Sequence, residues 1–215
     1  MGRSSLAIII PAKNEVKTIG RVIQNARKFG TVVVVDDGST DGTDKVSILK
    51  GAKLIKNKKN LFYDKSLNKG FEYVKKKKFK FIITIDGDGE HDLNMIPIFV
   101  KKLNRGYDLV IGRRKNLPRF SEKVISFIYQ KKYNVSDMYC GMKGYNSKWV
   151  KCFKKFDRFG SIGTDLASRI INQKNTKFIE VFIKINKRKD KPRIGNNFFA
   201  NLRIFKSFFL NLANN

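Results

Sequence analysis

Short apolar runs rich in β-branched residues alternate with amphipathic stretches through the first half of the chain. We expect the apolar runs to form strands at residues 6–10, 31–36, 52–56, 79–86 and 107–112. The stretches between them predict helices at residues 15–28, 41–50, 64–76 and 92–104. This alternation is typical of βαβ units, in which parallel strands form one sheet and helices cover its faces. The predicted fold class is therefore α/β with a mostly parallel sheet.

The rest of the chain is less regular, and no linker or internal repeat divides it. It predicts a strand at 177–185 and helices at 120–132, 161–172 and 197–212. A length of 215 residues suits one compact domain. We expect that domain to cover residues 1–195 and an amphipathic helix to lie within 196–215. Two interpretations of the helix stay open, because it could lie in a membrane interface or pack on the core of the protein.

The chain is strongly basic, with 46 Lys and Arg against 18 Asp and Glu and a formal net charge of +28. Such a charge attracts nucleic acid, an anionic membrane surface or a phosphorylated substrate. No apolar run approaches the roughly 20 residues that span a bilayer. Pro11 interrupts the first apolar run too early for a signal peptide, so we expect a cytoplasmic protein. Because the basic charge suits an anionic bilayer, we expect the protein to lie peripherally at the inner face of a membrane.

Half of the acidic residues follow three of the predicted strands. They are Glu15, Asp36, Asp37, Asp41, Asp44, Asp86, Asp88, Glu90 and Asp92. In an open parallel sheet, ligands bind outside the carboxyl ends of the strands. The acidic segments should therefore meet at one edge and form the functional site.

Asp86, Asp88 and Glu90 alternate after a buried strand, so on extended backbone their side chains point the same way. Carboxylates this close repel one another unless a cation lies between them. Mg²⁺ or Mn²⁺, with substrate phosphates completing its shell, explains the pattern. Helix capping is the alternative, and we expect it of Asp92. The phosphate-binding P-loop and the dinucleotide glycine fingerprint are both absent from the sequence.

Seven segments in order resemble family 2 glycosyltransferases of the GT-A fold, and among these the polyprenyl-phosphate (dolichol-phosphate) mannosyltransferase-like enzymes. The segments are IIIPAKNE, VVVVDDGSTDGT, NLFYDKSLNKG, IDGDGEH, IGRR, DMYCGMKGY and IEVFIKINKRKDKPRIG. Phe62 and Asp64 stand where the family usually has glycine. The resemblance implies a GT-A (Rossmann-like) sheet and metal-dependent, inverting transfer of a sugar from a GDP- or UDP-linked donor to a polyprenyl phosphate.

The resemblance also implies roles for individual residues. It places against the substrates Pro11, Ala12, Asn14, Glu15, Asp36, Asp37, Asp86, Lys143, Arg188 and Arg193. It assigns the metal to Asp86, Asp88 and Glu90, with Asp88 as the direct ligand. It places Arg113 near the diphosphate, where a guanidinium stabilises the charge that develops on the leaving group.

The acceptor stays open at the level of the sequence. A phosphate acceptor is already an anion and needs no general base, whereas a hydroxyl of a surface glycan or lipopolysaccharide does. Asp165 stands where many family members carry that base, but it could equally cap a helix. A nucleic-acid-binding protein is an alternative supported only by the net charge. A nucleotidyltransferase would carry a basic, glycine-rich signature that residues 11–15 lack.

Overall fold

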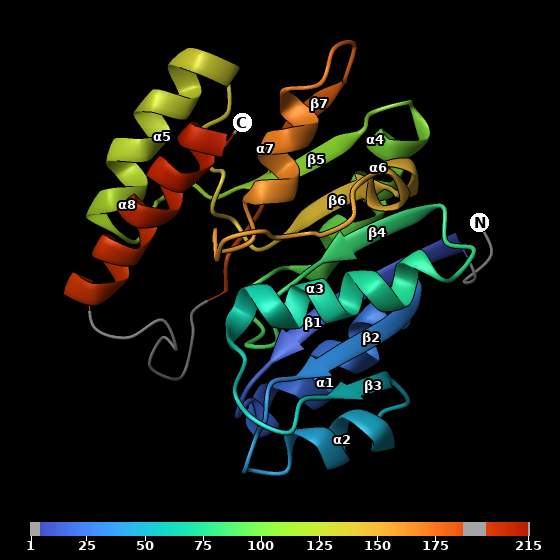
Figure 1. The fold of residues 1–215 in the computed structure, drawn as a ribbon. Helices are drawn as coiled ribbons and strands as arrows, with labels where there is room; N and C mark the ends of the chain where they lie inside the picture. Colours follow the sequence, from blue (N-terminus) through green and yellow to red (C-terminus); the bar gives the residue numbers. More distant parts are fainter. Residues whose placement is uncertain (1–4, 187–196, 215) are drawn as a thin grey trace.

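The chain is described here from a computed structural model, which defines residues 5–186 and 197–214. Its centre is a seven-stranded sheet in the order β3-β2-β1-β4-β6-β5-β7 (Figure 1). The strands are β1 (Leu6–Ala12), β2 (Thr31–Asp36), β3 (Lys53–Lys56), β4 (Phe81–Thr84), β5 (Leu109–Arg113), β6 (Lys143–Asn146) and β7 (Phe178–Phe182). Strand β6 runs antiparallel to both of its neighbours, and the other adjacent pairs are parallel. The predicted α/β class with a mostly parallel sheet is confirmed.

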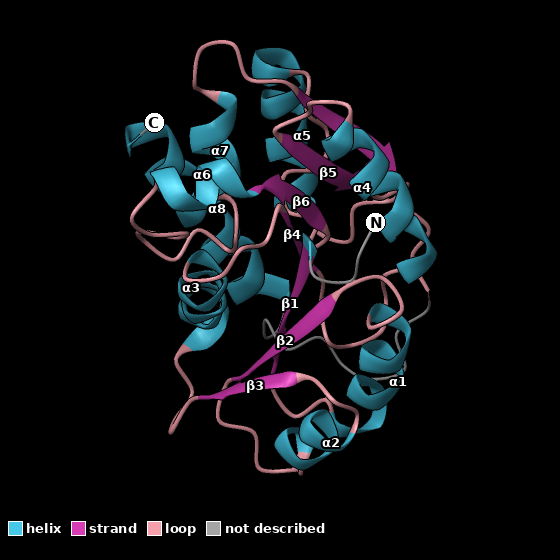
Figure 2. Ribbon diagram, turned by 90° about the vertical axis from the view of Figure 1, so that its right-hand side faces the viewer, coloured by secondary structure: helices cyan, strands magenta, loops and turns pink. Residues whose placement is uncertain are grey.

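Helices cover both faces of the sheet (Figure 2). They are α1 (Val16–Ala26), α2 (Thr43–Leu49), α3 (Phe62–Lys75), α4 (Ile96–Asn104), α5 (Phe120–Tyr133), α6 (Ser147–Cys152), α7 (Asp165–Ile171) and α8 (Asn197–Asn214), with a 3₁₀ turn at Leu93–Met95. Ala7 and Ile9 of β1 pack toward α3 and α7, whereas Ile8 and Ile10 pack toward α1 and α4. Because both faces of β1 are buried, its sequence is a continuous apolar run rather than an alternating one.

The prediction missed β6 and α6, which together cover residues 143–152. Strand β6 has the sequence KGYN and lacks an apolar run, and its place in the sheet depends on pairing with β4 and β5. The helix predicted at 161–172 begins at Asp165. It begins late because the Asp157 carboxylate accepts hydrogen bonds from the backbone N–H groups of Phe159, Gly160 and Ser161, which holds that stretch in a turn.

Helix α8 lies alongside α5, on the side of the sheet that α3 and α7 also cover (Figure 1). Its inner face, with Ala200, Ile204 and Phe208, is buried. Core packing is therefore one of its roles. Within the described residues, no helix is long and apolar enough to cross a membrane.

Candidate active site

The loops that follow β1 and β2 are joined by hydrogen bonds. Ala12 pairs with Asp36 in the sheet, so both loops leave the same edge. The backbone N–H of Asn14 donates to Ser39 Oγ at 2.9 Å, and the N–H of Thr40 donates to Asn14 Oδ1 at 2.9 Å. Pro11 and Ala12 are buried at the end of β1. The structure thus brings the first two predicted segments together.

Glu15 and Asp41 hold the starts of α1 and α2. The N–H of Glu15 donates to Thr43 Oγ1 at 2.8 Å, and the N–H of Val16 donates to Asp41 Oδ2 at 3.0 Å. Asp41 Oδ1 also accepts from the N–H and the hydroxyl of Thr43. Glu15 is buried, with Oε2 3.3 Å from the hydroxyl of Thr18. These contacts fix the frame on which a ligand would rest.

Asp36 and Asp37 are both buried, but they differ in their partners. Asp37 Oδ1 accepts from Asn57 Nδ2 at 2.9 Å and from the N–H of Leu61 at 2.7 Å, so it positions the loop before α3. Asp36 Oδ1 accepts from the N–H of Ser39, whereas Asp36 Oδ2 has no hydrogen-bond partner among the described residues. Burial raises the pKa of Asp36, and the hydrogen bonds from Ser39 offset part of that effect.

Asp86 follows β4 at the same edge and is held on several sides. Its Oδ1 accepts from the hydroxyl of Tyr63 at 3.2 Å, and its N–H donates to His91 Nδ1 at 3.2 Å. His91 Nε2 lies 3.8 Å from Asp86 Oδ2. A Cβ atom added at Gly141 would lie only 2.2 Å from Asp86 Oδ2, so a glycine at 141 leaves room for this carboxylate. The side chain of Asp86 keeps 33% of its surface exposed.

The loop between Asp86 and Asp92 carries the other two predicted metal ligands, Asp88 and Glu90. Asp88 Oδ1 accepts from the N–H of Glu90 at 3.0 Å, and the backbone of Gly89 is left-handed, with φ of 78°. Asp92 Oδ1 accepts from the N–H of Asn94, which confirms its predicted capping role. Within residues 5–186 and 197–214, no three His, Cys, Asp or Glu side chains form a group that could hold a metal ion.

The donor set therefore fits a metal that is only partly held by protein. Asp86 and Asp88 offer hard carboxylate oxygens, and the side chain of Asp86, which packs against the backbone of Gly141, keeps a third of its surface exposed. Mg²⁺ and Mn²⁺ commonly take one or two carboxylates and complete their shells with substrate phosphates and water. The site can accept such an ion together with a diphosphate.

Lys143 and Arg113 occupy the neighbouring strands. Lys143 is buried on β6, donates from Nζ to the carbonyl of Cys140 at 2.6 Å, and has a pKa lowered by burial. The guanidinium of Arg113 stacks over the Phe182 ring, 4.5 Å from its centre. The next residue, Arg114, forms ion pairs with Asp137 at 2.7 Å and Glu122 at 2.6 Å. The predicted contact of Arg113 with a diphosphate stays a prediction.

Asp165 is fully buried at the first residue of α7. Its carboxylate accepts from Arg158 Nη2 at 2.8 Å and from Arg169 Nε at 3.2 Å, as well as from the N–H of Arg158. A general base must reach the proton that it removes. The arrangement favours a structural role for Asp165, and its role as a base stays a prediction. Arg188 and Arg193 lie outside the described residues.

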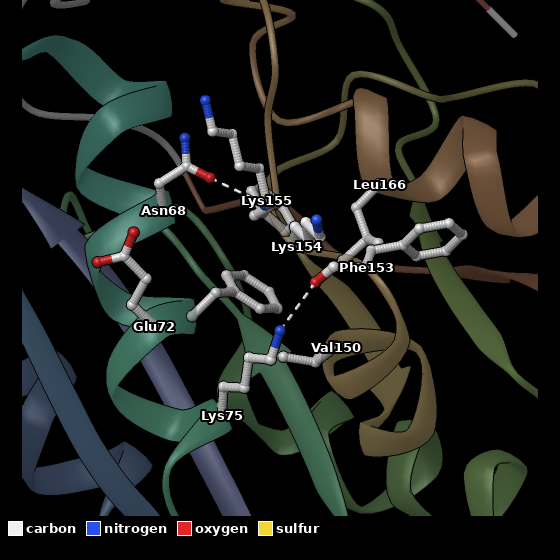
Figure 3. Close-up of a pocket in the computed structure, with 10 residues that line it drawn as sticks. Asn68, Glu72, Lys75, Val150, Phe153, Lys154, Lys155 and Leu166 are labelled. Atoms are coloured by element: carbon white, nitrogen blue, oxygen red, sulfur yellow. Dashed lines mark hydrogen bonds between the residues drawn. The ribbon is translucent and has the colours of Figure 1, made fainter.

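Sequence reasoning missed Tyr63 and Asn68, both of which lie in the segment NLFYDKSLNKG. Asn68 Oδ1 accepts from the N–H groups of Phe156 and Asp157, and its Nδ2 donates to the carbonyl of Asp157, each at 2.9 Å. Figure 3 shows Asn68 pointing from α3 toward this loop across a small pocket between α3 and α6. Asn68 thus ties the start of the loop that leads to Asp165 to the helix that carries Tyr63.

Known proteins resemble this chain in sequence and in fold. Residues 7–153 match the family described as Glycosyl transferase family 2. An uncharacterized protein of Methanocaldococcus jannaschii is 33% identical over 199 residues, covering 82% of this chain and 86% of that protein. An undecaprenyl-phosphate 4-deoxy-4-formamido-L-arabinose transferase of Shewanella sediminis is 28% identical over 167 residues, covering 68% of this chain and 49% of that protein.

Solved structures share the fold at lower identity. Glucosyl-3-phosphoglycerate synthase from Mycobacterium tuberculosis, in complex with Mn²⁺, uridine diphosphate and phosphoglyceric acid, superimposes with a TM-score of 0.78 at 17% identity. The superposition covers 96% of this chain and 78% of that one. The sheet is thus that of the GT-A glycosyltransferases. The family match covers 147 residues, from 7 to 153, and includes the acidic strand ends around Asp36 and Asp86. This chain therefore belongs to glycosyltransferase family 2.

Proposed function

We propose that this glycosyltransferase takes its sugar from a nucleotide sugar bound at the edge of the sheet that carries Asp36 and Asp86. The observation that carries the proposal is Asp36 Oδ2, a buried carboxylate oxygen without a partner among the described residues. A buried acceptor left without a donor is costly. Asp36 ends β2 in register with the end of β1, where an N–H or hydroxyl of a nucleoside would supply the missing donor after a small movement of the loop.

A divalent metal and the diphosphate of the donor would share the acidic edge. Asp86 and Asp88 would hold the ion, and the glucosyl-3-phosphoglycerate synthase structure with Mn²⁺ and uridine diphosphate supports this assignment. When bound, the metal would neutralise the charge that develops on the departing diphosphate. Asp86 contributes by keeping a fixed orientation between Tyr63, His91 and the backbone of Gly141.

The acceptor that we propose is a phosphate group on a polyprenyl chain. Asp165, the candidate base for a hydroxyl acceptor, is fully buried and paired with two arginines. A phosphate acceptor needs no such base, because its oxygen is already anionic. The Shewanella sediminis relative is named for an undecaprenyl phosphate, which supports a lipid carrier of the phosphate.

The surface of α5 and α8 supports peripheral contact with a membrane. Large apolar side chains are exposed along both helices, and they are Phe120, Val124, Phe127 and Ile128 on α5 and Phe198, Phe199, Leu202, Phe209 and Leu212 on α8. Lys123, Lys131 and Lys206 lie exposed among them. Exposed Phe and Leu together with Lys suit an anionic bilayer surface, into which apolar side chains insert while Lys contacts headgroups. A net charge of +28 opposes pairing of two copies through this face.

A transfer assay with the full chain tests the proposed function. Radiolabelled UDP- and GDP-sugars would be offered with Mn²⁺ or Mg²⁺ to a polyprenyl phosphate, to the matching polyprenol and to a glycan. We expect transfer to the polyprenyl phosphate only, lost on chelation of the metal and in Asp88→Ala, and retained in Glu72→Ala. Glu72 is an exposed acid on α3 and serves as the control. Transfer to the glycan alone would replace the proposed acceptor, and full activity of Asp88→Ala would contradict the assigned site.

A further inference from the structure

Tyr63 lies beside the acidic edge, although the family resemblance assigns it no role. It is the second residue of α3, and its hydroxyl donates to Asp86 Oδ1 at 3.2 Å. A phenol ordinarily has a pKa of about 10, so this hydroxyl is a hydrogen-bond donor at neutral pH.

The turn before α3 sets the orientation of the Tyr63 ring. Phe62 is left-handed, with φ of 69°, which is unusual for a bulky residue. The N–H of Leu61 is held by Asp37 Oδ1 at 2.7 Å, and the N–H of Phe62 is held by Asn60 Oδ1 at 3.0 Å. The turn thus links Asp37, at the end of β2, to the hydroxyl that touches Asp86, after β4.

The loop before α7 closes the other side of the ring. A Cβ atom added at Gly163 would lie 3.2 Å from Tyr63 Cε1, so the backbone of that loop packs directly on the phenol ring. The N–H of Gly163 donates to Asp64 Oδ1 at 3.0 Å, which fastens the same loop to the first turn of α3. Tyr63 therefore has little freedom to turn away from Asp86.

We propose that Tyr63 is a positioning residue that fixes the Asp86 carboxylate for the metal and the nucleoside diphosphate, an inference that rests on the proposed function. With Oδ1 engaged by the phenol, Oδ2 lies 3.8 Å from His91 Nε2 and packs against Gly141, where a side chain would displace it. A carboxylate held in one rotamer does not have to lose that freedom when it binds an ion. Without the phenol, Asp86 would need to be ordered at each binding event.

Tyr63→Phe removes the hydroxyl and keeps the ring, and Tyr73→Phe on the same helix is the matched control. Binding of UDP and GDP would be titrated calorimetrically with and without Mn²⁺, and Mn²⁺ binding alone would be followed by electron paramagnetic resonance. We expect about tenfold weaker metal-dependent nucleotide binding in Tyr63→Phe, the change that loss of one hydrogen bond to a charged group produces. The Tm and the binding by Tyr73→Phe should match those of the unaltered protein.

The outcomes separate this inference from the function on which it rests. If the unaltered protein binds neither nucleotide with Mn²⁺, the proposed function fails. If the unaltered protein and Tyr63→Phe bind equally well, the proposed function stands and the positioning role is overturned. Equal losses with and without Mn²⁺, accompanied by a lower Tm, would show a structural role of the hydroxyl and would also overturn the inference.

Discussion

Asp64, a buried residue in the first turn of α3, has an unusually high pKa for a carboxyl group. It is buried, faces the carboxyl group of Asp157 and lies 3.5 Å from the guanidinium of Arg203. Burial, and then the charge of Asp157, raises the pKa of Asp64 from 3.8 to about 7. Between pH 3.8 and about 7, Asp64 is therefore protonated in the folded chain, whereas in the unfolded chain it has lost its proton.

The pH dependence of stability follows from that proton. The free energy of unfolding should fall as pH rises from 3.8 to about 7. Above that pH, Asp64 is ionised in both states and should cause no further change. Asp64→Asn should flatten the pH dependence and raise the Tm at pH 8 relative to the unaltered protein. Thermal unfolding of both proteins from pH 5 to pH 8 measures this. Parallel pH profiles for the two proteins would contradict the expectation.

At Asp36 we expect a substitution to affect stability and nucleotide binding in opposite directions. Its Oδ2 is buried without a partner among the described residues, so the charged form is costly in the free protein. Asp36→Asn should therefore leave the Tm unchanged or higher while weakening nucleoside diphosphate binding by about tenfold or more, the effect of one hydrogen bond to a charged group. Glu72→Gln is the exposed control. Unchanged affinity in Asp36→Asn would exclude Asp36 from the nucleoside site.

At the scale of the elements, Asp165 connects the start of α7 to the loop before it. Its carboxylate neutralises Arg158 and Arg169, and Arg169 also donates to the carbonyls of Lys155 and Phe156. Removing one partner of a buried ion pair leaves a buried charge uncompensated. The stability of α7 and of its loop therefore depends on this one carboxylate.

Asp165→Asn should lower the free energy of unfolding by about 3 kcal/mol, as expected for a broken buried pair. If the acceptor is a phosphate, the folded variant should keep most of its transfer activity well below its Tm. Urea unfolding and activity per folded molecule, with Glu72→Gln as a surface control, give the two values. Normal stability with abolished transfer would instead restore Asp165 as the general base.

Strand β6 could not be predicted from the sequence, because its residues carry no local strand pattern. Every other strand carries apolar residues that mark it locally, whereas Lys143 and Gly144 give β6 no such signal. Gly144 packs against Phe99 and Leu103 of α4, because a Cβ atom there would lie 3.2 Å from each side chain. The antiparallel insertion between β4 and β5 is thus decided by packing and by backbone pairing with strands far away in the sequence.

At the scale of the whole molecule, the exposed apolar faces of α5 and α8 and the net charge of +28 predict binding to anionic bilayers. The protein should co-sediment with vesicles of phosphatidylcholine and phosphatidylglycerol, and less with phosphatidylcholine alone. Added salt should weaken the binding, because it screens exposed charges.

A paired substitution locates the binding face. Phe198→Ser with Phe209→Ser removes two exposed side chains of α8 and should reduce vesicle binding severalfold. Ile98→Ser is the matched control, because Ile98 is 41% exposed on α4, which covers the opposite face of the sheet. An equal loss in both variants would show that α8 has no special role.

The parallel strands and the acidic edge of the sheet could both be predicted from local sequence patterns. Strand periodicity is local, and because parallel strands end at one edge, the sequence is enough to place Asp36 and Asp86 together. The partners of each carboxylate, in contrast, became known from the three-dimensional fold alone. Tyr63 reaches Asp86 across 23 residues, and Asp165 is enclosed by the fold of its own loop. Side-chain partners of this kind depend on packing between distant elements, which no local pattern encodes.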